Sequence, residues 1–307
     1  MAFIRKKSKG NSYYYELVES KREGNKVIQK VLKYFPSLKE AEEYIKSENI
    51  ALQIDYNNWL DNDLKERLEN KFKTLSNLRP LSEDVLNTIK DKFEIDMSYH
   101  SNAIEGNRLT LRETWLVIRK GITISGKSLE EHLEATNHRE AIELIEKIAD
   151  KRENITEIDV LNLHAVILDK INPQNAGFYR RSNVFIQGSE LKLPKWRDVP
   201  ILMKRVYEEL NNQDKGIDAI YSSVKIHYDT VRIHPFIDGN GRLARLLMNL
   251  RLMRGGFPPA ILRKEERRAY YSALEKADRG DFRPLTMIIG KDVERALDLY
   301  IETFLEI

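Results

Sequence analysis

The chain has 307 residues, of which 41% are hydrophobic and 32% charged, and its net charge is +3. This composition predicts a globular protein with a sizeable core and excludes disordered and fibrous classes. The absence of cysteine excludes disulfides, thiol catalysis and thiolate metal sites. No apolar run approaches membrane-spanning length, and no signal-peptide core follows the first charges, so we expect a cytoplasmic protein with no membrane partner.

Residues 1–50 are predicted to form a small basic module of β-sheet plus helix. Residues 13–18 and 26–34 are β-branched or aromatic runs, and Glu23-Gly24-Asn25 between them is a hairpin-turn signal. Residues 3–7 could add a first strand. Ser37 and Glu40 have the spacing of a capping box for a helix that runs to about Asn49.

The positive charge of the chain is concentrated in this module. Residues 1–35 hold nine Lys and Arg and three Glu, a net charge of +6, and the remainder carries −3. Lysines and tyrosines along a sheet could bind the phosphate backbone of a nucleic acid. A solvated hairpin or a protein-docking module explains the same charges, and we favour those two interpretations.

From about residue 55 onward the hydrophobic period is helical, which predicts a mainly α fold. The predicted helices cover residues 55–75, 82–93, 110–120, 129–151, 156–171, 199–213, 216–232, 241–254, 265–279 and 281 to the end. One exception is the stretch 183–194, which predicts a short hairpin between two helices.

The string HPFIDGNGR, from His234 to Arg242, lies between two helical patterns. Pro235 must end the first helix, because the residue before a proline is pushed out of the helical region. The next apolar period starts at Leu243, so Asp238 to Gly241 is predicted as a tight loop that leads into a helix N-terminus. Free N–H groups and the helix dipole make such a loop an anion site, and its glycines allow a phosphate to approach closely.

The charged residues of this string predict nucleotide-dependent group transfer. Arg242 and Arg245 are three residues apart, so both guanidinium groups can point to the same side of the first helical turn, and arginine favours bidentate contacts with phosphate. Asp238 is a suitable ligand for Mg²⁺ bound to a polyphosphate. His234 has the residue type expected of a general base near neutral pH. A simple helix–turn–helix explains Asp-Gly-Asn-Gly as a turn, but it requires neither the histidine nor the arginines.

The string from His234 to Arg245 resembles the signature of Fic domains at every specified position, and the resemblance extends over about residues 96–290. It implies a helical fold in which AMP passes from ATP to a Tyr, Thr or Ser hydroxyl of a target protein. His234 would be the general base and Asp238 the Mg²⁺ ligand. The remaining implied ATP-binding residues are Gly239, Asn240, Gly241, Arg242 and Arg245. The related Doc toxins, which phosphorylate, usually carry Lys where Gly241 stands, so this glycine favours nucleotidyl transfer.

A second motif lies upstream, at Ser101, Glu105 and Gly106. The pattern predicts a helix that ends at a glycine cap, with Glu105 in its last turn, where the helix dipole disfavours a negative charge. A cationic partner is therefore expected, although an ordinary surface glutamate is the alternative. The motif is similar to the inhibitory motif of Fic proteins, which implies that Glu105 pairs with Arg245 and denies the γ-phosphate this contact.

Two further segments resemble parts of Fic proteins. The predicted hairpin occupies the place of a flap that clamps the target by strand pairing, and its candidate residues are Val184, Phe185, Ile186 and Gln187. A plain structural hairpin is the alternative. Residues 177–180 are expected to position this flap. Tyr270, Tyr271 and Asp278 resemble a segment that packs on adenine, but several relatives carry Asn at the position of Asp278, and an ionised Asp cannot donate a hydrogen bond. His227 is predicted to be structural, and His132, His138 and His164, which have no metal-ligand spacing, are predicted to be packing or surface residues.

The predicted organisation is a module of residues 1–50, a helical connector of residues 51–95, an inhibitory-helix region of residues 96–155, and a catalytic core with C-terminal helices over residues 156–307. The predicted function is a self-inhibited protein adenylyltransferase that uses Mg²⁺ and ATP on a target protein and on itself. One alternative is removal of AMP by the same site. Another is a regulator that binds DNA or a partner through residues 1–50 and senses nucleotide. Family members often form dimers, so a homodimer is also open.

Overall fold

The structure is a computed structural model that describes residues 2–9, 12–23, 26–37, 40, 41, 44, 59–79, 83–151, 153–185 and 192–305. Its contacts divide the chain into two compact units, Met1–Asn58 and Trp59–Ile307. The first contains strands and the second contains helices, as the sequence predicts.

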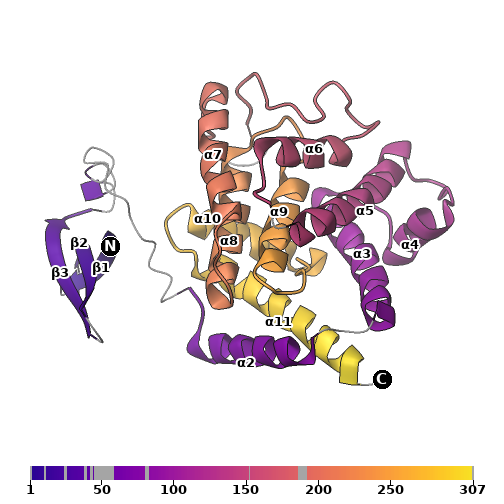
Figure 1. Cartoon of the computed structure of the whole chain (residues 1–307). Coiled ribbons are helices and arrows are strands. Elements are labelled where there is room, and N and C mark those ends of the chain that lie inside the picture. The colour runs from indigo at the N-terminus through magenta and orange to yellow at the C-terminus, as the bar shows by residue number, and fades with distance from the viewer. Residues whose placement is uncertain are drawn as a thin grey trace. The chain divides into compact units, whose positions relative to one another are not determined.

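The first unit is a three-stranded antiparallel sheet in the order β1-β2-β3 (Figure 1). The strands are β1 (Ala2–Lys9), β2 (Ser12–Glu23) and β3 (Lys26–Phe35). Leu17 and Phe35 are buried on one face with Ala41, and Tyr44 packs against this cluster. Residues 40, 41 and 44 are helical, but the rest of the predicted helix, up to Asn49, lies outside the described residues.

The second unit is built from helices, and most of their bounds agree closely with the predicted ranges. The exceptions are the first helix, which begins at residue 62 and not at residue 55, and the second, which continues past residue 93 to residue 105. The helices are α2 (Asn62–Leu78), α3 (Glu83–Glu105), α4 (Leu111–Lys120), α5 (Leu129–Asp150), α6 (Glu157–Ile167), α7 (Val199–Leu210), α8 (Ile217–Ile233), α9 (Asn240–Arg254), α10 (Arg267–Ala277) and α11 (Arg283–Leu305). None of the helices in the described ranges is long and apolar enough to cross a membrane.

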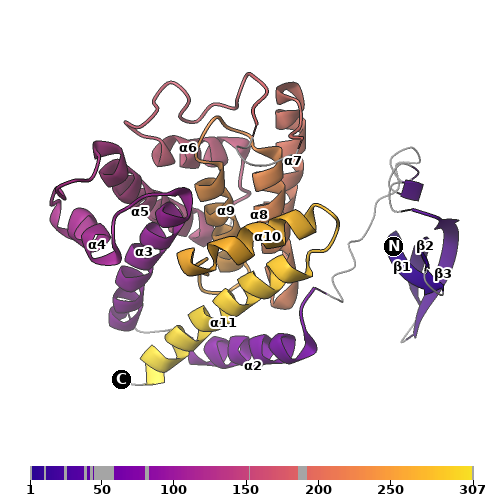
Figure 2. The same ribbon diagram turned by 180° about the vertical axis from the view of Figure 1, so that it is seen from behind.

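Helix α9 is central to the core of this unit. Its residues are buried on every side, among them Leu243, Leu246, Leu247 and Leu250. The helices that contact it include α3, α5, α6, α7 and α8. Helices α2 and α11 run side by side below this group (Figures 1 and 2). Because α9 has no exposed stripe, only its N-terminal end is free to take part in a site.

The helices around α9 have well-defined starts. Capping boxes form at the N-termini of α4, α5 and α6, where Thr110, Ser128 and Thr156 each cap the backbone three residues later. Each box satisfies two backbone donors that the helix itself leaves unpaired. These caps fix α5 and α6, which support the loop before α9.

The predicted hairpin is only partly described. Residues 183–185 and 192–195 carry no strand, and residues 186–191, which include Ile186 and Gln187, lie outside the described residues. The predicted boundary between residues 95 and 96 falls inside α3, so the connector and the inhibitory region share one helix.

Candidate active site

The loop between α8 and α9 contains the motif. Helix α8 ends at Ile233, His234 takes a left-handed conformation with φ of +49°, and α9 begins at Asn240. Gly239 also has a positive φ, +76°, which glycine adopts without strain. The motif is therefore a tight loop at a helix N-terminus, as its sequence predicts.

The side chain of Asn240 holds this loop together. Its Oδ1 accepts a hydrogen bond from the Phe236 N–H at 2.9 Å, and its Nδ2 donates to the Phe236 carbonyl at 3.0 Å. Asn240 is buried, so these bonds satisfy both polar groups of its amide. Only the backbone N–H of Asn240 therefore remains available to contact an anion.

His164, from α6, supports the loop from below. Its ring stacks on Phe236 with centroids 3.5 Å apart. Its Nδ1 accepts from the Gly177 N–H at 3.0 Å, so its Nε2 carries the ring proton and donates to the Asp238 carbonyl at 3.0 Å. Burial lowers the pKa of His164 to about 4, which keeps the ring neutral. Of the two predicted roles of His164, packing or surface, these contacts agree with packing.

Arg180 ties the motif loop to the base of the predicted flap. Its guanidinium group is buried and donates to backbone carbonyls: His234 at 2.8 Å, Ser182 at 2.9 Å and Pro194 at 2.6 Å. Its own N–H donates to the Pro235 carbonyl at 2.9 Å. Ser182 and Pro194 lie on opposite sides of the segment 186–191, so one side chain holds both ends of this region against the motif.

His234 is prepared to accept a proton. Burial lowers its pKa, and the nearby carboxylates of Glu105 and Asp238 offset this effect only in part. The ring is therefore neutral near pH 7, the state that a general base requires.

Asp238 places a carboxylate at the solvent-accessible side of the loop. Half of its side chain is exposed, its Oδ1 accepts from the Gly239 N–H at 2.6 Å, and its Oδ2 lies 3.5 Å from Arg242 Nη2. Within the described ranges, no group of three or more His, Cys, Asp or Glu side chains could hold a metal ion. Mg²⁺ bound to a nucleotide needs only one or two carboxylates, because phosphate oxygens and water complete its shell, and Asp238 fits that role.

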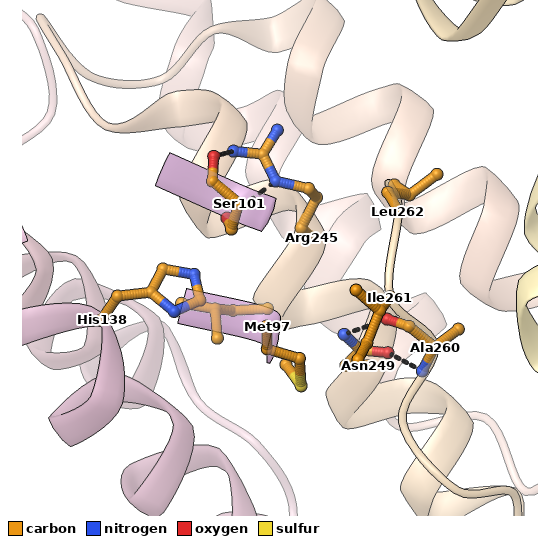
Figure 3. A pocket seen from close by; sticks show the side chains of 9 residues that line it. Met97, Ser101, His138, Arg245, Asn249, Ala260, Ile261 and Leu262 are labelled. Carbon is orange, nitrogen blue, oxygen red and sulfur yellow. Dashed lines mark hydrogen bonds between the residues drawn. The ribbon is translucent and has the colours of Figure 1, made fainter. Parts of the chain in front are cut away.

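Both motif arginines are buried and have acidic neighbours. Arg242 pairs with Glu134 of α5 at 3.1 Å. Arg245 donates from Nε to the Ser101 hydroxyl and from Nη2 to the Ser101 carbonyl, both at 2.9 Å (Figure 3), and its Nη2 lies 2.7 Å from Glu105 Oε1. Burial alone would lower the pKa of Arg245, but the charge of Glu105 holds it above its ordinary value. The predicted pair of Glu105 with Arg245 is thus present.

The carboxylate of Glu105 lies at the N-terminus of α9. Glu105 is the last residue of α3, and Gly106 follows with a φ of +111°. A Cβ atom added to Gly241 would overlap Glu105 Oε1, so the carboxylate lies directly against this glycine. A negative charge at the end of α3 is disfavoured by its own dipole but is stabilised here by Arg245 and by the positive end of α9.

A small cavity of about 10 Å³ lies beside Arg245, between α3, α5, α9 and the segment 260–262 (Figure 3). Met97 and Ser101 line it from α3, and His138 lines it from α5. Burial and the two motif arginines lower the pKa of His138 to about 3, so this ring is neutral. Such a volume suffices for one water at most.

The predicted adenine segment lies on α10 and just after it. Tyr270 is buried, and its hydroxyl is 3.1 Å from Nε2 of His227, whereas 38% of Tyr271 is exposed. Asp278 accepts hydrogen bonds from the Tyr228 hydroxyl at 3.0 Å and from Arg232 Nη2 at 2.7 Å. The carboxylate of Asp278 is therefore already engaged by two side chains of α8.

The sequence does not identify Glu134 as the partner of Arg242, and it does not reveal the exact contacts that His164 and Arg180 make. Each lies 54 or more residues from its partner in the motif. Helical periodicity places such residues on buried faces but does not reveal which distant backbone group they meet. The one local signal in the sequence is the position of Arg180 just before the predicted flap, which indicates a role in positioning it.

The fold and the loop together define a helical protein with a glycine-containing loop at the N-terminus of its central helix, a neutral histidine in that loop, and a carboxylate paired with an arginine. The chain belongs to the Fic/DOC family, whose model matches residues 154–252. A fragment of Fic-1 from C. elegans is 31% identical, with a TM-score of 0.71, and the match covers 80% of this chain and 73% of that one. A Fic domain containing signaling protein from Bacteroides thetaiotaomicron is 27% identical, with a TM-score of 0.70, over 78% of this chain and 97% of that one.

Curated relatives are similar over much of this chain. The protein adenylyltransferase Fic of Culex quinquefasciatus is 37% identical over 244 residues, which is 79% of this chain and 48% of the relative. The protein of the same name from Nematostella vectensis is 36% identical over 244 residues, 79% of this chain and 56% of the relative. The chain thus spans about half the length of the curated relatives it matches.

Proposed function

We propose that this chain is a protein adenylyltransferase, which transfers AMP from ATP to a hydroxyl of a target protein and is held inactive by Glu105. The observation that carries the proposal is the single loop and helix start that brings His234, Asp238, the glycine N–H groups and Arg245 together, with Glu105 on Arg245 at 2.7 Å. The names of the curated relatives support the same activity.

The proposed transfer forms one bond and breaks another. The target oxygen attacks the α-phosphorus of ATP, the bond from that phosphorus to the bridging oxygen breaks, and pyrophosphate leaves. Neutral His234 takes the proton of the attacking hydroxyl. The N–H groups of Gly239 to Gly241 and the guanidinium group of Arg242 stabilise the phosphate charge that develops. Asp238 would hold Mg²⁺, which neutralises part of the polyphosphate charge when it is bound.

In the proposed inhibited state, Glu105 competes with the nucleotide for Arg245. The carboxylate uses Arg245 Nη2 and lies against Gly241, where a phosphate would approach the end of α9. A γ-phosphate would then face a negative charge in place of a guanidinium group. The triphosphate must shift, and its α-phosphorus is no longer aligned with His234.

The flap is proposed to hold the target by pairing with an extended segment of it. Phe185 is 89% exposed, and Val184 beside it is half-buried. Arg180 anchors both ends of this region to the motif loop. A flap fixed in this way would present the bound segment to His234.

A second candidate, removal of AMP by the same site, is favoured by the position of Glu105. Its side chain is 34% exposed, and its charge acts on His234. A carboxylate that faces solvent beside the catalytic histidine could orient a water for attack on a phosphodiester. AMP transfer and AMP removal would use the same residues; Glu105 would inhibit AMP transfer and would take part in AMP removal.

The proposal is tested with ATP labelled at either the α- or the γ-phosphate. The Glu105→Gly variant, with magnesium, should label itself or proteins of a cell extract from α-labelled ATP only. Label from the γ-phosphate alone would show phosphoryl transfer and contradict the proposal. Purified labelled protein, returned to the native chain, would lose its label if AMP removal also occurs, and the Glu105→Gly variant would leave it intact.

A further inference from the structure

A groove of about 470 Å³ lies beside the motif loop, and the proposed transfer gives it no role. One wall is formed by side chains of the segment 174–182, which precedes the flap, and the other by Ile237, which lies between Phe236 and Asp238. Its volume falls within the range of about 300–1,000 Å³ that is usual for binding sites. We call this concavity the acceptor groove.

The wall before the flap is held in place by short-range structure. Residues 173–177 form turns that end at Gly177, whose φ is +77°. A Cβ atom at Gly177 would lie 3.1 Å from a side chain of α6, so glycine lets the turns pack closely on that helix. Arg180 then turns inward to the backbone of the motif loop, whereas Phe178 and Arg181 remain exposed.

The acceptor groove exposes two large apolar side chains. Phe178 is 57% and Ile237 39% exposed, and both line the groove. Single exposed apolar residues are common on protein surfaces and need no explanation. Here two of them come from segments that are 59 residues apart and meet in one concavity. Together they form an apolar surface that suits a side chain of a partner.

The acceptor groove and the flap beside it also carry positive charge. Residues 174–197 hold five Lys and Arg and one Glu, a net charge of +4. Arg180 is occupied by backbone carbonyls. Arg181, which lines the groove, is exposed and forms no hydrogen bond or ion pair with any other residue that the structure describes. The groove therefore combines an apolar surface with a cation that can take a carboxylate.

We propose that the acceptor groove selects the target segment by its side chains. A large apolar side chain of the target lies against Phe178 and Ile237, and an acidic side chain of the target pairs with Arg181. This inference rests on the proposed AMP transfer and names the kind of segment that the site modifies. Strand pairing with the flap supplies affinity that is independent of sequence, and pockets for side chains supply specificity.

The groove lies close enough to the base to read residues near the acceptor. Ile237 is three residues after His234, and three residues of chain span at most about 11 Å. The acceptor hydroxyl has to lie within hydrogen-bond reach of His234. An extended target segment therefore places in the groove a side chain that is within about four residues of the acceptor.

The observations favour an acidic peptide over a nucleic acid. A polyanion in the groove would be repelled by the triphosphate bound at the same loop, whereas a single carboxylate at Arg181 meets much less repulsion. Asp238, which is next to Ile237 in the chain, is assigned to Mg²⁺ in the proposed reaction, so its charge is offset there. The isoleucine offers no planar face for stacking, which a nucleobase would need.

The test uses the Glu105→Gly chain with α-labelled ATP and synthetic peptides of 11 residues. Each peptide has a central Tyr or Thr in an alanine background, and Glu, Lys or Phe is placed in turn at each of the four positions on either side. The measurement is the initial rate of label incorporation. At one or more positions we expect Glu to exceed Lys about threefold to tenfold, since exposed charge pairs are weak, and Phe to exceed Ala about tenfold.

Two variants assign these preferences to the groove, and each has a matched control. Arg181→Glu should reverse the charge preference, so that Lys exceeds Glu, an outcome that a folding defect does not produce. Lys73→Glu makes the same change of charge at an exposed position of α2 and should leave the preference unchanged. Phe178→Ala should remove the preference for Phe but keep that for Glu, whereas Leu305→Ala, at an exposed position of α11, should affect neither.

The possible failures are distinguishable. No label in any peptide, in the chain itself or in proteins of a cell extract would refute the proposed AMP transfer. Transfer that occurs with equal rates for Glu and Lys at every position, or with the same preference in Arg181→Glu, would overturn this inference alone. So would label in the chain or in extract proteins but in no peptide. Stronger inhibition of peptide labelling by a 12-nucleotide single-stranded DNA than by the best unlabelled peptide would assign the groove to a nucleic acid.

Discussion

At the scale of single residues, Glu105 and Gly241 depend on each other. The carboxylate lies where a side chain of residue 241 would be, and it reaches Arg245 because that space is empty. Glycine at this position therefore has two consequences: a phosphate can approach the end of α9, and the competing carboxylate can do so as well. The backbone of Gly241 is not in the left-handed region, so alanine is conformationally allowed there.

Gly241→Ala should therefore release part of the inhibition. The new methyl group displaces the Glu105 carboxylate, so we expect faster AMP incorporation than in the native chain, but a smaller gain than in Glu105→Gly, because the methyl group also narrows the approach of the phosphate. The measurement is the initial rate of incorporation from α-labelled ATP. In the Glu105→Gly background the same substitution should bring no gain, since no carboxylate is left to displace. An unchanged rate in the native background would contradict the proposed role of this contact.

His234 determines the acidic limit of activity. Burial lowers its pKa below the ordinary value of 6.5, so the ring stays neutral to a lower pH than a free histidine. Activity is present above the lowered pKa and is lost as the pH falls through it. For Glu105→Gly, kcat/KM plotted against pH should have its acidic limb below pH 6.5. Because Glu105 raises the pKa of His234, its removal should move the limb further toward acid; a limb above 6.5 would be inconsistent with a neutral, desolvated base.

At the scale of elements, the position of α3 on α9 controls the site. Arg245 donates two hydrogen bonds to Ser101, one turn before Glu105, and one to Glu105 itself. Helix α3 therefore holds the arginine as well as opposing the nucleotide. The small cavity beside Arg245 shows that the packing of α3 on α9 is incomplete at this point.

Ser101→Ala should loosen this interface. It removes one hydrogen bond to a charged group, worth about 1.5–3 kcal/mol, and so shifts α3 toward the released state by about 10- to 100-fold. Transfer should rise, but less than in Glu105→Gly. The initial rate of AMP incorporation measures this effect. Ser98 is the matched control, because it is buried one turn earlier and its hydroxyl has no hydrogen-bond partner among the described residues; equal rates in Ser98→Ala and Ser101→Ala would exclude the proposed mechanism.

The elements themselves were largely predictable. Residues 241–254 were predicted as a helix that follows a tight loop, and α9 covers residues 240–254. The end of α3 at Glu105, with Gly106 as its cap, followed from glycine chemistry alone. These features depend on residues that are close together in the sequence, which is why the sequence predicts them. Asp278 is different, because its hydrogen-bond partners Tyr228 and Arg232 lie 50 and 46 residues away in the sequence. These contacts depend on how α8 packs against the segment after α10, and the local sequence does not predict that packing.

At the scale of the whole molecule, the two units have separate cores. Residues 59–307 contain the motif, the inhibitory helix and the supporting residues, whereas the sheet has its own small cluster around Leu17 and Phe35. Trp59, the first residue of the second unit, stacks on Phe282 with ring centroids 4.4 Å apart. The residues of the proposed site, from Ser101 to Asp278, all belong to the second unit.

Deletion of residues 1–54 should therefore leave AMP transfer intact. In the Glu105→Gly background, the shortened chain should melt cooperatively and incorporate AMP within about twofold of the full-length variant, since its core is intact. A shortened chain that folds but no longer transfers AMP would show that the first unit contributes to the site.

The central claim is that one site transfers AMP, with His234 as its base and Glu105 as its inhibitor. The most direct test is the intact mass of three proteins after incubation with magnesium and ATP: the native chain, Glu105→Gly, and Glu105→Gly with His234→Ala. We predict an added mass of one AMP that is faint in the first, strong in the second and absent in the third. Equal modification of all three, or an added phosphate in place of AMP, would contradict the claim.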